Sequence, residues 1–288
     1  MKVLITGCFG QVGTELMALA SKHGCEAVGF NHATLDITNQ EAVHQKIIQE
    51  RPDAVINAAA YTAVDNAEID RENAFSVNAK AVGYLAKSCA ELNIPLVHIS
   101  TDYVFDGQKL SAYKEDDEVT PIGVYGQTKH AGEQAVKHVC EKYYILRTSW
   151  VFSIHGSNFV KTMLRLGAER EVLSVVSDQM GKPTSATEIA DTIYKILTSK
   201  KDAWGTYHMA QPNVTTWFDF ANDIFKEARA QGIPLKILNL NAIDTKDYPT
   251  LAKRPINSHL SCDKLEMIFG LKIIPWSGSL NEVVKGLK

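Results

Sequence analysis

The sequence predicts an α/β fold in which a Rossmann-like, doubly wound parallel sheet is followed by a smaller C-terminal lobe. Short, β-branched apolar runs alternate with longer segments of helical periodicity through the first half of the chain. These runs are apolar throughout, as strands are when helices cover both faces of a parallel sheet. A length of 288 residues allows one large α/β domain with an additional lobe.

The expected elements follow one another in a regular order up to Trp150. Strands are expected at residues 3–6, 27–30, 54–57, 96–100 and 143–148, and helices at residues 11–23, 40–50, 67–92 and 124–141. Beyond Trp150 the rhythm loosens, with a helix at 158–167, a strand at 173–176, a break at 181–183 and a helix from Thr187. Residues 1–150 are therefore expected to form the sheet domain, with some later segments returning to it, and residues 151–288 mainly the smaller lobe.

The composition excludes several classes of partner. Hydrophobic residues make up 45% of the chain, charged residues 22%, and the net charge is −3, so no basic excess indicates nucleic acid or an anionic membrane surface. No apolar stretch approaches the roughly 20 residues of a membrane span. The cysteines are odd in number and lack paired spacing, which argues against a disulfide framework and a zinc site. We therefore expect a cytoplasmic protein that acts on small molecules.

A glycine-rich turn connects the first expected strand to the first helix. Gly7, Gly10 and Gly13 have the spacing G-x-x-G-x-x-G, and backbone N–H groups at such a helix start can bind a pyrophosphate. The alternative is a tight turn that serves packing alone. The first interpretation predicts a dinucleotide-binding domain at residues 1–150 and a substrate-binding lobe mainly at 151–288. The residues expected to contact the dinucleotide are Gly7, Gly10, Gln11, Val12, Gly13, Asn31, Asp36, Ile37, Ala58, Ala59, Ala60, Tyr125 and Lys129.

The segments after the second and third strands indicate the kind of dinucleotide. Asn31 and His32 stand where an acidic residue would bind a ribose 2′-hydroxyl and exclude a 2′-phosphate, so NADPH and NADH are both allowed. Asp36 either reaches the adenine side of the site or caps the helix that begins near Asn39. The small side chains of residues 58–60 suit a cofactor lying close to the backbone, and they suit plain close packing as well.

Three residues predict the chemistry. Tyr125 and Lys129 are four residues apart and share one face of an expected helix, where the ammonium can lower the pKa of the phenol from its usual value near 10. Thr101 ends the fourth strand, at the sheet edge where doubly wound folds bind ligands. A hydroxyl there can orient a carbonyl for hydride attack. The alternatives are a solvated helix face and an ordinary turn residue.

These motifs together resemble the extended short-chain dehydrogenase/reductase family, whose members mostly act on nucleotide sugars. The resemblance rests on Gly7, Gly10 and Gly13 together with Thr101, Tyr125 and Lys129. Within that family, further segments are similar to the dTDP-4-dehydrorhamnose reductases and cover nearly the whole chain. These segments are residues 35–38, 59–65, 100–107, 125–133, 147–153, 158–163, 178–184 and 254–258.

The resemblance implies NAD(P)H-dependent reduction of dTDP-4-dehydro-L-rhamnose to dTDP-L-rhamnose, the last step of dTDP-rhamnose biosynthesis. It implies that Tyr125 gives a proton to the forming alkoxide at the sugar C4, that Lys129 keeps the phenol acidic and holds the nicotinamide ribose, and that Thr101 fixes the carbonyl. The residues that it places at the substrate are Thr101, Tyr103, Tyr125, Trp150, Pro183 and Arg254. Packing alone remains open for Trp150, and a surface ion pair for Arg254.

Some family members are described as metal-linked dimers. Glu15, Glu188 and Asp191 are retained here, but carboxylates on solvated faces usually have no such role, so Mg²⁺ is possible and is not predicted. Nor does any group of histidines have metal-ligand spacing. A homodimer is allowed without a sequence signature for it.

Two other functions compete with reduction. A sugar-nucleotide dehydratase or epimerase shares Tyr125 and Lys129, but dehydratases of this superfamily follow the threonine with an Asp-Glu pair. Here Asp102 is followed by Tyr103, which argues against dehydration and leaves epimerisation open. A non-catalytic regulatory subunit, like that of methionine adenosyltransferase, is the second alternative, and the intact Thr101, Tyr125 and Lys129 argue against it.

Overall fold

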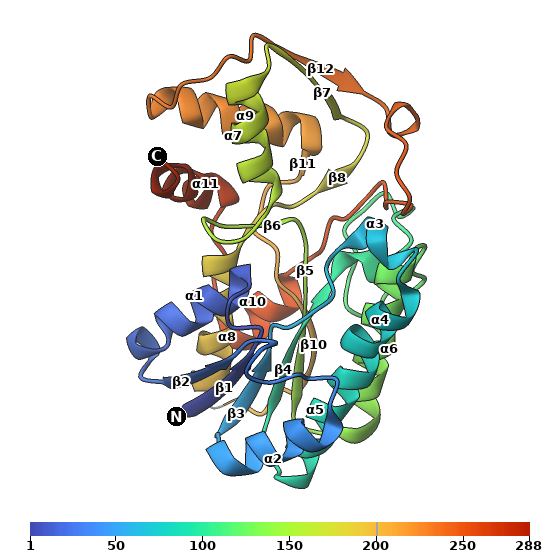
Figure 1. The fold of residues 1–288 in the computed structure, drawn as a ribbon, viewed down its shortest axis with the longest axis vertical. Coiled ribbons are helices and arrows are strands. Elements are labelled where there is room, and N and C mark those ends of the chain that lie inside the picture. Colours follow the sequence, from blue (N-terminus) through green and yellow to red (C-terminus); the bar gives the residue numbers. More distant parts are fainter. Residues whose placement is uncertain (200) are drawn as a thin grey trace.

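A six-stranded parallel sheet forms the centre of the larger lobe. The computed structural model describes residues 1–199 and 201–288. The sheet order is β10-β5-β4-β3-β1-β2, so the chain moves outward from β1 to β2 and then crosses to the other side of β1 at β3 (Figure 1). This reversal is the switch point beside which doubly wound folds bind ligands. The strands are β1 Lys2–Thr6, β2 Glu26–Phe30, β3 Ala54–Asn57, β4 Leu96–Thr101, β5 Tyr143–Thr148 and β10 Gly205–His208.

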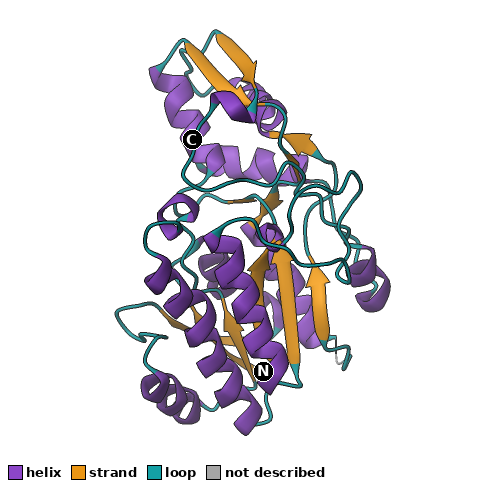
Figure 2. Ribbon diagram, turned by 90° about the vertical axis from the view of Figure 1, so that its right-hand side faces the viewer, coloured by secondary structure: helices purple, strands orange, loops and turns teal. Residues whose placement is uncertain are grey.

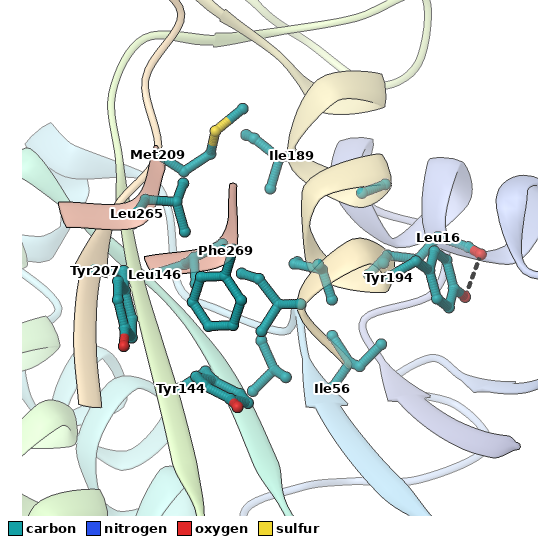
Figure 3. Packing of buried hydrophobic residues seen from close by; sticks show 14 of the residues in the cluster. Leu16, Ile56, Tyr144, Leu146, Ile189, Tyr194, Tyr207, Met209, Leu265 and Phe269 are labelled. Atoms are coloured by element: carbon teal, nitrogen blue, oxygen red, sulfur yellow. Dashed lines mark hydrogen bonds between the residues drawn. The ribbon is translucent and has the colours of Figure 1, made fainter. Parts of the chain in front are cut away.

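Helices cover both faces of this sheet. On one face lie α1 (Gln11–Leu19), α8 (Ala186–Thr198) and α10 (Asp263–Phe269); on the other lie α2 (Gln40–Glu50), α5 (Ala81–Glu91) and α6 (Val124–Val139). Figure 3 shows the first of the two cores, where Leu16 of α1, Tyr194 of α8 and Phe269 of α10 pack towards the sheet. The Tyr194 hydroxyl donates a 2.6 Å hydrogen bond to Leu16 O, which joins α8 to α1.

The smaller lobe has its own core and is built from segments after residue 150 (Figures 1 and 2). β12 pairs in parallel with β7, and β11 pairs antiparallel with β8. A short pairing of β6 (Val151–Phe152) with β9 (Thr184–Ser185) lies where the chain passes between the lobes. The lobe contains α7 Phe159–Glu169, β7 Val172–Val176, β8 Met180–Gly181, β11 Thr215–Thr216, α9 Trp217–Ala230, β12 Asn239–Ile243 and α11 Trp276–Gly286. Residues after 150 therefore serve both lobes, because α8, β10 and α10 pack on or in the sheet.

Several expected helices have different bounds in the structure. The helix expected at 11–23 ends at Leu19 and is followed by a 3₁₀ turn, Ser21–His23, that Gly24 closes with φ +67°. The helix expected at 67–92 is a succession of α3 (Val64–Ala67), α4 (Arg71–Phe75), a π-helical turn (Ser76–Lys80) and α5. Short 3₁₀ turns also occur at Asp102–Val104 and Thr245–Asp247.

The π-helical turn has a specific cause. The Asn78 side chain accepts from Tyr61 N at 2.8 Å and donates to Tyr61 O and to Thr128 Oγ1, each at 3.0 Å. These bonds tie the segment after β3 to α6, and a π-turn widens the helix so that one amide reaches both.

Within the described part of the chain, no helix is both long and apolar enough to cross a bilayer.

Candidate active site

The carboxyl ends of the sheet strands face the smaller lobe (Figure 2). Residues that line the main cleft lie at these strand ends. The cleft has a volume of about 1180 Å³ and is walled by the segments after β1, β2 and β3, the end of β4, the start of α6 and Trp217 of the smaller lobe. Every residue expected to contact a dinucleotide lines this cleft except Gly13. Thr101, Tyr103 and Trp150 line it too.

Close backbone contacts shape the glycine-rich turn. Gly7 has φ +70°, and a Cβ there would lie 2.6 Å from Ala59 N; a Cβ on Gly13 would lie 2.1 Å from Gly7 O. Gly13 therefore packs α1 against the turn and is covered by it. Gly10 is the N-cap of α1, and no side chain in the described residues caps that helix start. The free N–H groups and the positive end of the helix dipole face the cleft, which fits a dinucleotide pyrophosphate.

The segment after β2 also lines the cleft. Asn39 caps α2 by accepting from Ala42 N, so the alternative in which Asp36 caps this helix is wrong. Asp36 instead accepts from the backbone N–H and the hydroxyl of Thr38, bonds that hold the pKa of its carboxyl below the usual value. Asn31 and His32 both border the cleft, and neither presents a carboxylate to it.

The three proposed catalytic residues converge on one end of the cleft. Thr101 is the last residue of β4, and its Oγ1 accepts from Tyr103 N at 3.2 Å. Tyr125 stands in the first turn of α6, where the Glu68 carboxylate accepts from Val124 N at 2.8 Å and holds the helix start. The rings of Tyr103 and Tyr125 pack edge to face with centroids 5.7 Å apart.

The protonation behaviour of the pair differs from the expectation. Burial raises the pKa of Tyr125 to about 12, although hydrogen bonding with the Thr101 side chain lowers it in part. Burial lowers the pKa of Lys129 to about 8. The Lys129 ammonium donates to Ile99 O at 2.7 Å. The burial of both side chains therefore acts against the expected lowering of the Tyr125 pKa by Lys129.

Trp150 forms the opposite wall with a partner that the sequence did not indicate. Its ring stacks on Trp217 with centroids 3.5 Å apart and planes 9° apart. Its backbone has φ +47°, and a Cβ on Gly181 would lie 2.4 Å from the Trp150 ring. The indole is therefore fixed between Gly181 and Trp217, a contact made by residues remote in sequence.

Two predicted substrate residues lie outside the main cleft. Arg254 lines a second cavity of about 880 Å³ and makes a two-pronged ion pair with Asp65 of α3, with N–O distances of 2.7 and 3.2 Å. Asp65 follows Val64, which lines the main cleft. Pro183 is buried between β8 and β9 and borders neither cavity.

Two of the three carboxylates weighed for a metal, Glu15 and Asp191, have basic partners. Glu15 lies 3.3 Å from His155, and Asp191 contacts Lys22, His23 and Lys195. Among residues 1–199 and 201–288, no three His, Cys, Asp or Glu side chains are grouped so that they could hold a metal ion.

Asp102 is a cleft residue whose environment sequence reasoning did not anticipate. It is 3% exposed, and its Oδ1 accepts from Thr101 Oγ1 at 2.9 Å. Its Oδ2 finds no hydrogen-bond partner of good geometry in the described part of the chain. Burial raises the pKa of Asp102 to about 6, against the opposing effect of the Ser258 and Thr101 hydroxyls.

We expect Asp102→Asn to stabilise the protein at neutral pH. Because the native state binds this proton more tightly than the unfolded chain, wild-type stability falls as the pH rises from about 4 through about 6, and the variant lacks this loss. The unfolding free energy of the variant minus that of wild type should grow by about 2 to 3 kcal/mol between about pH 4 and pH 7. Urea unfolding across this range measures it. A difference that is constant with pH would show that the pKa of Asp102 is the same in the native and the unfolded protein.

The chain matches known proteins along its full length. A family model described as RmlD substrate binding domain matches residues 1–288. The dTDP-4-dehydrorhamnose reductase of Aggregatibacter actinomycetemcomitans is 44% identical over 287 residues, which is 98% of each chain.

Two solved structures have the same fold. A dTDP-4-dehydrorhamnose reductase from Clostridium acetobutylicum superposes with a TM-score of 0.93 at 38% identity, covering 100% of this chain and 99% of the other. The dTDP-4-dehydrorhamnose reductase of Bacillus anthracis in complex with NADP has the same TM-score and identity and covers 99% of both chains. The protein belongs to the RmlD substrate binding domain family, within which these relatives are dTDP-4-dehydrorhamnose reductases.

Proposed function

We propose that this protein is an NAD(P)H-dependent oxidoreductase that reduces dTDP-4-dehydro-L-rhamnose to dTDP-L-rhamnose, the last step of dTDP-rhamnose biosynthesis. The observation that carries the proposal is the convergence of Thr101, Tyr125 and Lys129 beside the glycine-rich turn. The proposal is also supported by the 44% identity of this chain to a dTDP-4-dehydrorhamnose reductase.

The cofactor would lie along the row of segments that follow β1, β2 and β3. The first-turn N–H groups of α1 would hold the pyrophosphate, and the small side chains of residues 58–60 would let the dinucleotide approach the backbone. When bound, the reduced nicotinamide supplies the hydride that reaches the sugar C4. Since Asn31 and His32, directly after β2, carry no carboxylate, both NADPH and NADH would be accommodated.

Side chains of the protein would donate the proton and orient the carbonyl group of the sugar. Thr101 would donate to the C4 oxygen and orient it, and Tyr125 would transfer its hydroxyl proton to that oxygen as negative charge develops. Lys129 would hold the nicotinamide ribose and, as an ammonium beside the cleft, favour release of the Tyr125 proton. The high pKa of Tyr125 keeps it protonated and ready to act as an acid.

The sugar nucleotide would occupy the space between the lobes. Tyr103 and Trp150 would flank the sugar, since both line the main cleft near Tyr125. Arg254 would contact the diphosphate from the second cavity, where Asp65 fixes its guanidinium. Pro183 would shape the strand connection behind Trp150, because Thr184 N donates to Trp150 O. A cytoplasmic location and a homodimer remain predictions, the former supported by five buried, unpaired cysteines among the described residues.

A stoichiometric assay tests the function. The protein is incubated with dTDP-4-dehydro-L-rhamnose and either NADPH or NADH, and cofactor oxidation is followed together with product identity. We expect one reduced cofactor to be consumed for each dTDP-L-rhamnose formed. An epimerase or dehydratase would instead turn over many sugars without net oxidation, and a regulatory subunit would give no product.

A further inference from the structure

We propose that His98 is a positioning residue for the active-site lysine: Asn57 holds it as the neutral Nε2–H tautomer, and it presents that N–H to Lys129 Nζ. The catalytic consequence rests on the proposed function, whereas the tautomer itself can be measured without turnover. Nothing in the sequence pattern indicated this role, because the contacts join three strands and a helix.

A row of polar side chains crosses the sheet beneath the cleft. Thr6, Asn57 and His98 stand at paired positions of the neighbouring parallel strands β1, β3 and β4. At most 1% of each residue is exposed. Thr6 Oγ1 donates to Asn57 Oδ1 at 2.6 Å, and Asn57 Nδ2 lies 3.0 Å from His98 Nδ1. The row therefore runs from the residue before the glycine-rich turn to the centre of the sheet.

A backbone amide fixes the direction of these hydrogen bonds. Ala59 N–H can only donate, and it donates to Asn57 Oδ1 at 3.2 Å. The other terminal atom of Asn57 is then the NH₂ group, so His98 Nδ1 must accept and carries no proton. Burial and the charge of Lys129 both hold the pKa of His98 well below its usual value, so the ring is neutral. Its single proton must lie on Nε2.

The Nε2–H then faces the amine of Lys129. The two nitrogens are 3.5 Å apart, and Lys129 Nζ also donates to Ile99 O at 2.7 Å. An ammonium has three donors and no acceptor, so it cannot accept a hydrogen bond from the His98 N–H and is repelled by it. A neutral amine has a lone pair that can accept this hydrogen bond. The arrangement therefore favours loss of a proton from Lys129.

The other ionisable groups next to Lys129 on α6 either favour its charged form or carry no charge. Glu133, one turn further along α6, favours the charged amine, but its carboxylate is engaged by Arg147 of β5 and Ser100 of β4. Tyr125, one turn earlier, is neutral at physiological pH. His98 is thus the ionisable group of β4 that contacts the Lys129 amine. Burial lowers the pKa of Lys129 to about 8, so a small further change in this pKa alters how much of the amine is protonated near neutral pH.

This placement makes Lys129 a proton store for Tyr125. After Tyr125 gives its proton to the C4 oxygen, a proton from the Lys129 ammonium would reach the phenolate through water in the cleft: an N–H bond of Lys129 breaks and the O–H bond of Tyr125 forms again. The resulting neutral amine accepts the His98 Nε2–H. Lys129 then regains a proton from water in the cleft, so the cycle is balanced with no additional reagent.

Nuclear magnetic resonance tests the tautomer directly in the wild-type protein. With ¹⁵N-labelled histidine, and His98→Asn to identify the signal, we expect a protonated Nε2 and an unprotonated Nδ1 from about pH 6 to pH 9. A signal from a protonated Nδ1 or from an imidazolium would overturn the proposal. This measurement is independent of activity, so it distinguishes failure of the inference from failure of the proposed reductase function.

A double-mutant cycle tests the effect on Lys129. Asn57→Asp keeps an acceptor for Thr6 and Ala59 but requires a proton on His98 Nδ1, which turns Nε2 into an acceptor for the ammonium. We expect the Lys129 pKa, read from the ¹³Cε shift of labelled lysine, to rise by at least about one unit, or about tenfold in the equilibrium.

The control is the same substitution in the His98→Asn background, where the new charge remains and the imidazole is absent. The shift should be clearly smaller there. An equal shift in both backgrounds would mean that the introduced carboxylate acts by charge alone, and the proposal would be wrong. In a protein that reduces the keto sugar, the alkaline limb of the kcat profile should follow the Lys129 pKa in the single variant.

Discussion

Tyr125→Phe is expected to lower kcat for keto-sugar reduction by about 10² to 10⁴, the usual contribution of a general acid. The phenyl ring keeps the edge-to-face packing on Tyr103 and the start of α6, so the loss should reflect the missing proton. Dinucleotide binding should stay near wild type because the glycine-rich turn is untouched. Steady-state kinetics and fluorescence titration with NADPH measure the two effects.

Tyr103→Phe is the matched control for this variant, since it removes a hydroxyl from the same cleft without removing the proposed acid. It is expected to act mainly on KM. Wild-type turnover by the Tyr125 variant, or an equal loss of kcat in both variants, would contradict the assignment of the proton donor.

The largest effect on stability is expected from Arg147→Met. Arg147 of β5 and Glu133 of α6 form a buried pair, with Arg147 Nε and the terminal guanidinium nitrogen 2.9 and 2.7 Å from the two carboxylate oxygens. Ser100 of β4 also donates to Glu133, at 2.6 Å. Removing the arginine leaves the buried carboxylate with the partly exposed Lys137, 3.8 Å away, as its cationic neighbour. Breaking a buried pair in this way typically costs about 3 to 5 kcal/mol of unfolding free energy. Denaturant unfolding measures the loss.

The pH dependence of that loss gives a second check. Burial alone would raise the pKa of Glu133, but hydrogen bonds from Arg147 and Ser100 hold it well below its usual value. In wild type this carboxylate therefore stabilises the fold above its unfolded pKa, near 4.3, and the contribution is lost as the pH falls towards the native value. In the variant the carboxylate is destabilising at neutral pH, so the difference between the two proteins should shrink in acid.

Two further variants separate this pair from ordinary charge effects. Arg147→Met with Glu133→Gln removes both charges and should recover part of the stability. Arg165→Met breaks an exposed ion pair with Glu169 and should change little. An equally small effect from Arg147→Met would contradict the view that the pair joins α6 to β4 and β5.

Local signals in the sequence were sufficient to predict many of the strands and helices of the larger lobe. The expected strand at 54–57 and helix at 40–50 have the same bounds as β3 and α2, because Pro52 precedes the strand and Asn39 caps the helix. The glycine spacing predicted the turn, since the close approaches of Gly7 and Gly13 leave no room for a side chain. The interruption at the π-turn was missed because it depends on Asn78 reaching Tyr61 and Thr128.

The parts of the site that escaped prediction depend on contacts between distant segments. Trp217 contacts Trp150 only when the smaller lobe packs, and Asp65 contacts Arg254 although 189 residues separate them in the sequence. The pKa of Tyr125 depends on burial, which helix periodicity does not report. The role of His98 emerges only from the paired positions of Thr6 and Asn57 on the neighbouring strands.

Transfer of deuterium from the cofactor to the sugar separates net reduction from the competing functions. The protein is incubated with dTDP-4-dehydro-L-rhamnose and NADPH deuterated at the transferred position, and the product sugar is analysed by mass spectrometry and nuclear magnetic resonance. We expect dTDP-L-rhamnose with one deuterium at C4 and one oxidised cofactor for each product molecule. A product without deuterium at C4, or an isomerised sugar with no net oxidation of the cofactor, would contradict the proposed reduction.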